Sequence, residues 1–264
     1  MRAKIPDWFI YLAVVLLIYG NAKRQATKID TPDFPPELGE MLPSETPRDK
    51  RIVVAVQSPR SGIGTAFAIS DNGKWITARH VVDSCDEVGI DVGGLNIIRV
   101  DAEVSPNSDT AILTSSWRRK SLAHDLSSQR QIGERGYFFG FPQGKPGDAV
   151  GTLLGRNRMI VRGRYRSDES ILAWSEIGRS RGLRGSLGGL SGGPVLDKDG
   201  EVIGVISAES PRRGRIYTVA PSNLKGKFSS NTQSPTALTL QSYGLEADRL
   251  RRERRIAQVI CLVN

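Results

Sequence analysis

A serine in a glycine-rich turn is the residue of this sequence best suited to covalent chemistry. Ser191 lies in Gly189-Leu190-Ser191-Gly192-Gly193-Pro194, immediately before the apolar run Val195-Leu196. Glycines beside a nucleophile let the chain turn tightly and let a substrate carbonyl approach backbone N–H groups. A serine hydroxyl is a weak nucleophile unless a neighbouring base accepts its proton. The turn therefore predicts acyl transfer, on the condition that the chain also supplies a histidine and an orienting carboxylate.

Only two histidines can provide the base, and both precede Ser191. An α/β-hydrolase needs its histidine after the serine, so that fold is excluded. His80 follows the apolar run Trp75-Ile76-Thr77-Ala78, as a side chain projecting from the rim of a barrel would. His124 lies in a polar stretch beside Asp125, and we interpret it as a surface residue. His80 is therefore the expected base.

Asp109 is the expected orienting acid because it stands at the head of the apolar run Thr110-Ala111-Ile112-Leu113. Asp91, Asp101 and Asp125 lie in more polar or less strand-like surroundings. The order Asp, His, Ser of subtilisin-like enzymes would require long helices between the strands, and these are absent. The order His, Asp, Ser remains, and it is one of the known orders of a catalytic triad.

The sequence predicts that short strands position these residues. β-Branched runs are separated by Gly, Asp and Asn, which favours an all-β sandwich or pair of barrels over βαβ units. The runs are 52–57, 65–70, 75–78, 97–100, 111–114, 137–141, 159–161, 201–207 and 216–220. Asp71-Asn72-Gly73 and Lys198-Asp199-Gly200 are typical of hairpin turns. Residues 240–263 contain spaced Leu, Val and Ile among charges and predict a C-terminal helix.

The N-terminus carries an uncharged, mainly apolar run from Trp8 to Gly20, flanked by Arg and Lys. Its length fits a secretory signal peptide or an uncleaved signal anchor, and we keep both for residues 1–22. Either one places the rest of the chain outside the cytoplasm, in a bacterial periplasm or at the inner membrane. There Cys85 and Cys261 could form a disulfide, although two buried free thiols fit as well. Residues 23–47 are polar and Pro-rich and predict a flexible linker.

Composition limits the other partners. The 264 residues carry a formal net charge of +9. Two Cys and two His exclude a disulfide-dense scaffold and leave too few ligands for a four-ligand zinc site, so neither a metal nor a cofactor is expected. We interpret the arginines of residues 156–184 and those of the C-terminal helix as lying on solvent-exposed faces. The C-terminal helix and the N-terminal run are candidates for contact with a membrane surface. No nucleic-acid-binding motif is present, and the oligomeric state is open.

Taken together, the motifs around His80, Asp109 and Ser191 resemble those of the chymotrypsin-like (trypsin-fold) serine proteases, nearest to the bacterial HtrA-like branch. The resemblance implies a serine endopeptidase domain at residues 48–225, with two six-stranded antiparallel β-barrels that divide near 120–132 and a connector and basic helix at 226–264. It implies that His80 is general base and acid, that Asp109 fixes the histidine tautomer, and that Ser191 is the nucleophile. The N–H groups of Gly189 and Ser191 would form the oxyanion hole.

The same resemblance implies a peptide-binding strand at Ser207, Ala208 and Glu209 and a primary pocket with Gly185 near its base. Since no acidic residue is evident at that base, we expect a small or medium apolar side chain in the pocket. Two residues depart from the family, Leu190 before the nucleophile and Arg79 before the base, and the residues after Lys225 are too few for a PDZ module. The alternative function is a catalytically silent trypsin-fold protein that binds peptides or acts as a scaffold at the membrane.

Overall fold

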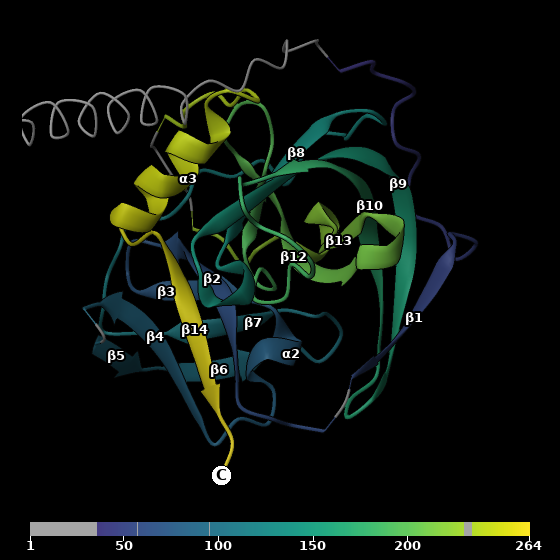
Figure 1. The fold of residues 1–264 in the computed structure, drawn as a ribbon. Coiled ribbons are helices and arrows are strands. Elements are labelled where there is room, and N and C mark those ends of the chain that lie inside the picture. The colour runs from purple at the N-terminus through teal and green to yellow at the C-terminus, as the bar shows by residue number, and fades with distance from the viewer. Residues whose placement is uncertain (1–35, 57, 95, 230–233) are drawn as a thin grey trace, which may run out of the picture. The chain divides into compact units, whose positions relative to one another are not determined.

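Two β-sheets form the framework of the protein (Figure 1). The structure is a computed structural model, and it describes residues 36–56, 58–94, 96–229 and 234–264. Each sheet contains seven of the strands found among these residues. The expected all-β fold is therefore confirmed, with one short helix near the C-terminus.

The first sheet has the order β5-β4-β14-β2-β3-β7-β6, and all of its pairs are antiparallel. Most of its strands come from the first half of the chain: β2 (Gly62–Ser70), β3 (Lys74–Thr77), β4 (Glu87–Gly93), β5 (Asn96–Arg99), β6 (Asp101–Val104) and β7 (Ala111–Thr114). The four-residue helix α2 (Arg79–Val82) follows β3. The seventh strand, β14 (Ile256–Leu262), comes from the C-terminus and lies between β2 and β4.

The second sheet closes on itself through the pairing of β8 with β9. Its members are β8 (Arg135–Gly140), β9 (Gly147–Gly163), β10 (Ser167–Arg179), β11 (Pro194–Leu196), β12 (Val202–Ser210) and β13 (Arg215–Val219). The short 3₁₀ turns η1 (Pro142–Gly144), η2 (Pro211–Arg213) and η3 (Pro221–Leu224) lie between or after these strands. β1 (Arg51–Val56) adds to the outside of this ring by pairing in parallel with β9.

The strand count differs from the expected six per barrel for two reasons. The ring β8 to β13 does contain six antiparallel strands, and β1 is a seventh strand that runs parallel to β9. In the first sheet the extra strand is β14, which the sequence analysis assigned to a helix. Strands β4, β6 and β10 were also missed, because Gly, Asp and other polar residues interrupt their apolar patterns.

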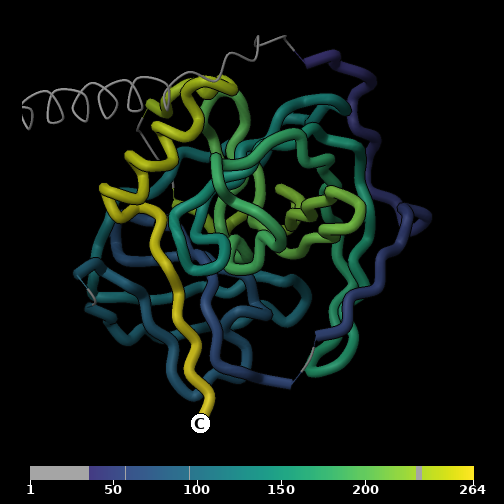
Figure 2. Tube along the Cα trace, viewed as in Figure 1, coloured from purple at the N-terminus to yellow at the C-terminus, as the bar shows by residue number. Residues whose placement is uncertain are grey.

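The C-terminal segment is half helix and half strand, so the prediction of one helix over 240–263 was wrong in extent. Helix α3 (Tyr243–Arg252) ends at Arg252, and Arg254 has a φ of 56°, in the left-handed region. This turn lets the chain leave the helix and enter β14, which Figure 2 shows running from α3 along the first barrel. Cys261 of β14 forms a disulfide with Cys85, which settles the question left open by the sequence.

Separate clusters of buried side chains form the core of each barrel and the contact between the barrels. Trp75, Ile90 and Leu113 belong to the core of the first barrel, and Phe138 and Trp174 belong to that of the second. A third cluster joins the barrels to each other and to α3. It contains Phe67 and Ile76 from the first barrel, Phe139 and Val205 from the second, and Tyr243 and Leu250 from the helix. Such burial is the main source of stability in a fold of this kind.

The segment before β1 is not a free tether where the structure describes it. Leu42 is 3% exposed and packs in the core of the second barrel, and Gly39 and Leu42 form backbone hydrogen bonds with Ile132 and Arg130. The apolar N-terminal run lies outside the described residues. No helix within the described ranges is long and apolar enough to cross a membrane.

Candidate active site

His80 and Asp109 are brought together by the first barrel. His80 lies in α2, directly after β3, and Asp109 lies in the turn before β7, the strand that pairs with β3. The His80 Nδ1 atom is 2.8 Å from Asp109 Oδ2 and 3.1 Å from Oδ1. The backbone N–H of His80 also donates to Asp109 Oδ1, at 3.0 Å. The imidazole is therefore fixed at one nitrogen, and its other nitrogen can receive a proton.

Ser191 comes from the second barrel and faces the same cavity. A cavity of about 660 Å³ is lined by His80, Asp109 and Ser191, together with β1 and the β9–β10 hairpin. Among the described residues no hydrogen bond joins the His80 ring to the Ser191 hydroxyl. Such contacts between base and nucleophile are often long in the absence of substrate. The structure thus brings the predicted base, acid and nucleophile to one cleft, with the first two in direct contact.

The loop before Ser191 has backbone N–H groups that are not used within the described part of the chain. Gly189 has a φ of 98°, and its carbonyl accepts a hydrogen bond from the Thr65 hydroxyl at 2.7 Å. The carbonyl of Gly188 accepts from the backbone N–H of Gln143. In the part of the chain that the structure describes, the N–H groups of Gly189 and Ser191 have no partner. Two neighbouring N–H groups are thus free to bind an oxygen of another molecule.

Asp109 is held by the second barrel as well as by His80. Tyr165, at the tip of the β9–β10 hairpin, donates its hydroxyl proton to Asp109 Oδ1 at 2.9 Å, and the Ser207 hydroxyl donates to Oδ2. Behind Asp109, its backbone N–H donates to Glu169 Oε1 at 2.6 Å. The sequence analysis missed Tyr165 and Glu169, because both lie in a polar hairpin whose contacts with the first barrel leave no local pattern.

The electrostatics of His80 and Asp109 suit a base and its orienting acid. Burial disfavours charge on His80, but the Asp109 charge and hydrogen bond outweigh it and raise the pKa of the imidazole. Burial likewise opposes charge on Asp109, yet His80 and the hydrogen bonds from His80 and Ser207 hold the pKa of that carboxyl below its usual range. Asp109 therefore stays ionised and stabilises an imidazolium on His80.

Arg79, the unusual residue before the base, is directed away from the imidazole. Its guanidinium donates to the Ser105 carbonyl at 2.8 Å and lies 3.8 Å from the centre of the Tyr165 ring. It also pairs with Asp83, 3.5 Å away. Arg79 therefore links the first barrel to the β9–β10 hairpin, which explains its presence beside the active residues.

The residues expected to bind substrate lie in different places. Ser207, Ala208 and Glu209 line a second, mostly apolar cavity of about 210 Å³ beside Ser191, but Gly185 does not line it. Gly185 is exposed, and its carbonyl accepts a hydrogen bond from Arg179. The cavity does contain one carboxylate, that of Glu209, which accepts hydrogen bonds from the Ser186 hydroxyl and the Leu187 N–H.

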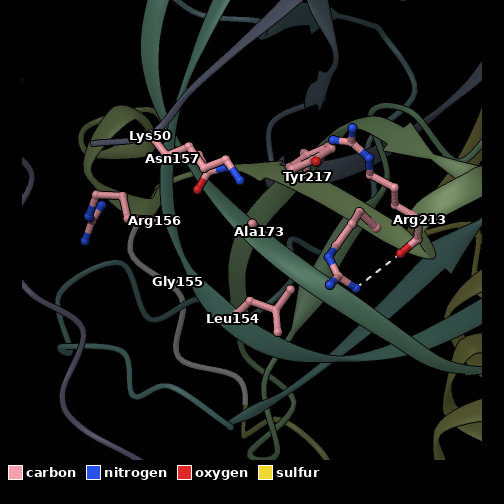
Figure 3. Close-up of a pocket in the computed structure, with 9 residues that line it drawn as sticks. Lys50, Leu154, Gly155, Arg156, Asn157, Ala173, Arg213 and Tyr217 are labelled. Carbon is pink, nitrogen blue, oxygen red and sulfur yellow. Dashed lines mark hydrogen bonds between the residues drawn. The ribbon is translucent and has the colours of Figure 1, made fainter. Parts of the chain in front are cut away.

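The other candidates from the sequence do not belong to this cleft. His124 is half-buried, and its ring contacts that of Phe228. Another cavity, of about 530 Å³ on strands β9, β10 and β13, is lined by basic residues that include Arg156 and Arg213 (Figure 3). These two side chains point in different directions in Figure 3, so they do not converge on one ligand. Asp125, Asp197 and Glu201 bring three carboxylates together, a grouping typical of metal ligands. Arg130 forms ion pairs with Asp125 and Asp197.

A family model of the trypsin-like peptidase domain matches residues 64–205, more than half of the chain. The chain belongs to the trypsin-like peptidase family. Its membership, which the sequence motifs predicted, supports a serine-type endopeptidase.

Two curated relatives are described as bacterial serine endoproteases. A probable periplasmic serine endoprotease, DegP-like, from Bartonella henselae is 29% identical over 160 residues, which are 58% of this chain and 29% of that protein. A protein of the same description from Pseudomonas fulva is 26% identical over 207 residues, 74% of this chain and 40% of that protein. The chain therefore spans less than half the length of either relative.

Solved structures support the fold. The active form of the Rv3671c protease from M. tuberculosis has a TM-score of 0.51 and 18% sequence identity, and the match covers 66% of this chain and 77% of that one. The inactive form of the same protease gives a TM-score of 0.50 at 20% identity, covering 63% and 84%. At these identities the similarity concerns the arrangement of the barrels alone.

Proposed function

We propose that this peptidase cleaves peptide bonds through an acyl-enzyme formed on Ser191. The observation that carries the proposal is the contact of His80 Nδ1 with Asp109 beside the cavity that Ser191 also lines. His80 takes the Ser191 proton as the hydroxyl oxygen attacks the substrate carbonyl, and then gives it to the leaving amine. Water attacks the acyl-enzyme by the same route in reverse. Asp109 keeps the Nδ1 proton in place throughout.

The oxyanion of the tetrahedral intermediate would bind to the N–H groups of Gly189 and Ser191. Both groups lack an internal partner among the described residues, so binding an oxygen breaks no existing hydrogen bond. Removal of one such donor typically costs about 2.7–4 kcal/mol of transition-state stabilisation. This pair of donors is the second part of the proposed machinery.

The substrate would be an extended peptide with an apolar side chain in the cavity of about 210 Å³. Leu187, Ile206 and Ile216 line this cavity, and they favour a side chain of small or medium size. The Glu209 carboxylate is already engaged by Ser186 and Leu187, which argues against a salt bridge with a basic substrate residue. Peptide backbone would pair with β12 by strand addition.

We further propose that the domain acts in the periplasm. Two curated relatives are named periplasmic, and the Cys85–Cys261 disulfide fits an oxidising compartment. The apolar run at residues 8–20 would direct the export.

The decisive experiment labels the purified protein with a fluorophosphonate probe and measures hydrolysis of a peptide library. Ser191→Ala is expected to abolish labelling and hydrolysis, and His80→Ala to reduce both by at least about a thousandfold. Both variants should keep the far-UV circular dichroism of the wild type. Wild-type protein that neither reacts with the probe nor cleaves peptides, yet binds them, would instead be a silent peptide-binding member of the family.

A further inference from the structure

Glu169 is a buried carboxyl group of the second barrel that reaches the main chain of the first. It lies on β10 and is 3% exposed. Its Oε1 accepts the backbone N–H of Asp109 at 2.6 Å, and its Oε2 accepts the Ser108 hydroxyl at 2.7 Å. Asn223, on η3, donates to the same Oε2 at 3.3 Å. Both oxygens are therefore used, and the two shortest bonds cross from one barrel to the other.

Glu169 lines neither of the two cavities beside Ser191. It therefore cannot touch a substrate there, and any influence on catalysis must pass through Asp109. The Asp109 side chain is already fixed by Tyr165 and Ser207, also from the second barrel. Glu169 adds the contact that these two cannot make, because it holds the backbone from which the Asp109 side chain projects.

We propose that Glu169 is a positioning residue that fixes the Asp109 main chain and keeps the Asp109 carboxylate on His80 Nδ1. The proposal rests on the proposed function, because it takes Asp109 as the orienting acid. Without Glu169, the buried N–H of Asp109 would lose its partner, and the turn would have to move to satisfy it. A small movement of an orienting acid misaligns the imidazole and slows proton transfer.

The charge of Glu169 acts in the same direction as its hydrogen bonds. Burial and the neighbouring Asp109 charge raise the pKa of Glu169 to about 7, against hydrogen bonds from Ser108, Asp109 and Asn223 that favour ionisation. Asp109 is the charged group that raises the pKa of Glu169. At His80, the Asp109 charge raises the pKa of the imidazole and the Arg164 charge lowers it. Ionised Glu169 therefore adds negative potential behind Asp109 and favours the imidazolium form of His80.

The test compares Glu169→Ala with the neighbouring Asp168→Ala in the full-length chain. Glutamine at position 169 would keep an oxygen that can accept the Asp109 N–H, so alanine is needed to remove that partner. Asp168 is exposed and pairs with Arg158, so it controls for the loss of one carboxylate from β10. Proton NMR would follow the His80 Nδ1 proton and the His80 titration without substrate, and kinetics would give kcat and KM against pH. In Glu169→Ala we expect the pKa of His80 to fall by on the order of half a pH unit. We also expect kcat to fall about tenfold at constant KM, as for a loss confined to the transition state. Asp168→Ala should change neither.

An unchanged His80 titration and a kcat within twofold of wild type in folded Glu169→Ala would overturn the proposal. If Glu169→Ala does not fold, Glu169→Gln decides through the His80 titration, because it removes the negative charge and keeps an acceptor for the Asp109 N–H. An unchanged pKa of His80 in that variant would again overturn the proposal. If the NMR shift is present but neither the wild type nor any variant hydrolyses peptides, the proposed function fails and the positioning role stands.

Discussion

At the scale of single residues, the backbone conformation of Gly189 sets the position of an N–H group that the proposed mechanism uses. Its φ of 98° is one that residues with a Cβ seldom adopt, and a Cβ there would lie 2.4 Å from the Phe141 carbonyl oxygen. Gly189→Ala must therefore move the loop and its N–H group. We expect kcat/KM to fall by at least about a hundredfold, because one oxyanion donor is displaced.

Gly185→Ala is the matched control for this prediction. Gly185 also has a positive φ, of 75°, but a Cβ there would meet nothing within 4 Å. It therefore carries a similar backbone strain without a clash, and should lose stability but retain most of the activity. Equal activity losses in the two alanine variants, measured with one peptide substrate, would show that strain alone explains the effect at Gly189.

Glu169 also predicts how stability changes with pH. Its pKa in the folded chain is about 7, raised from an ordinary value of 4.5. A raised carboxyl pKa means that the folded state binds the proton more tightly, so its contribution to stability is complete below about pH 4.5 and is lost as the pH rises through 7. Glutamine has no such loss. Between pH 5 and 8, the free energy of unfolding of Glu169→Gln should gain on the order of 2 kcal/mol relative to wild type.

Guanidinium unfolding of both proteins at pH 5 and pH 8 would measure this difference. Loss of the Glu169 side chain is expected to lower kcat, so at this position activity would require a group that lowers stability above pH 7. A difference in unfolding free energy that stays constant between the two pH values would mean that Glu169 does not titrate in this range.

At the scale of elements, the short strands beside the three proposed catalytic residues could be predicted from the sequence. β3 and β7 have uninterrupted apolar runs, and His80, Asp109 and Ser191 each follow or precede such a run. The hairpin of β9 and β10 could be predicted only in small part. Its 17- and 13-residue strands contain many charged residues, which interrupt an apolar strand pattern. The turn between them is held by contacts with the first barrel, as Arg164 pairs with Asp83. Tertiary contacts of this kind leave no periodic pattern in the sequence.

The prediction for the C-terminal segment was wrong for a different physical reason. A helix normally ends at glycine or proline, whereas α3 ends before Arg254, which adopts a left-handed conformation without a glycine. Nor do the arginines all lie on a solvated face, since Arg251 and Arg255 are 7% and 8% exposed. Arg251 pairs with Asp148 at 2.7 Å and thereby attaches α3 to the second barrel.

The disulfide is the element-scale feature with a direct test. It joins Cys261 of β14 to Cys85, three residues after the end of α2, and closes a loop with a sequence separation of 176. Loops of this length should give roughly 5 kcal/mol by the chain-entropy argument, and measured values are typically about 2–4 kcal/mol. We expect the double variant Cys85→Ser/Cys261→Ser to lose about 2–4 kcal/mol in guanidinium unfolding, and wild type under reductant to show the same loss. Equal stability of oxidised and reduced wild type would contradict this.

At the scale of the whole molecule, the C-terminal strand is built into the middle of the first sheet. β14 pairs along its length with β2 on one side and with β4 on the other, so it is an internal strand of the sheet. Its side chains Ala257 and Val259 lie in the core of the first barrel, whereas α3 packs where the two barrels meet. This segment is therefore part of the fold, where the sequence analysis expected one helix over 240–263.

Removal of residues 240–264 should therefore destroy the fold rather than change the control of activity. The deletion exposes the edges of β2 and β4 together with the apolar cluster under α3, and such edges promote aggregation. We expect the truncated chain to be insoluble, or to lose its near-UV circular dichroism and all labelling of Ser191 by the fluorophosphonate probe. Removal of Val263 and Asn264 alone is the control, because both follow β14, and it should leave labelling within about twofold of wild type. A soluble, labelled protein that lacks 240–264 would mean that β2 and β4 can pair without β14 and that the C-terminus is an accessory segment.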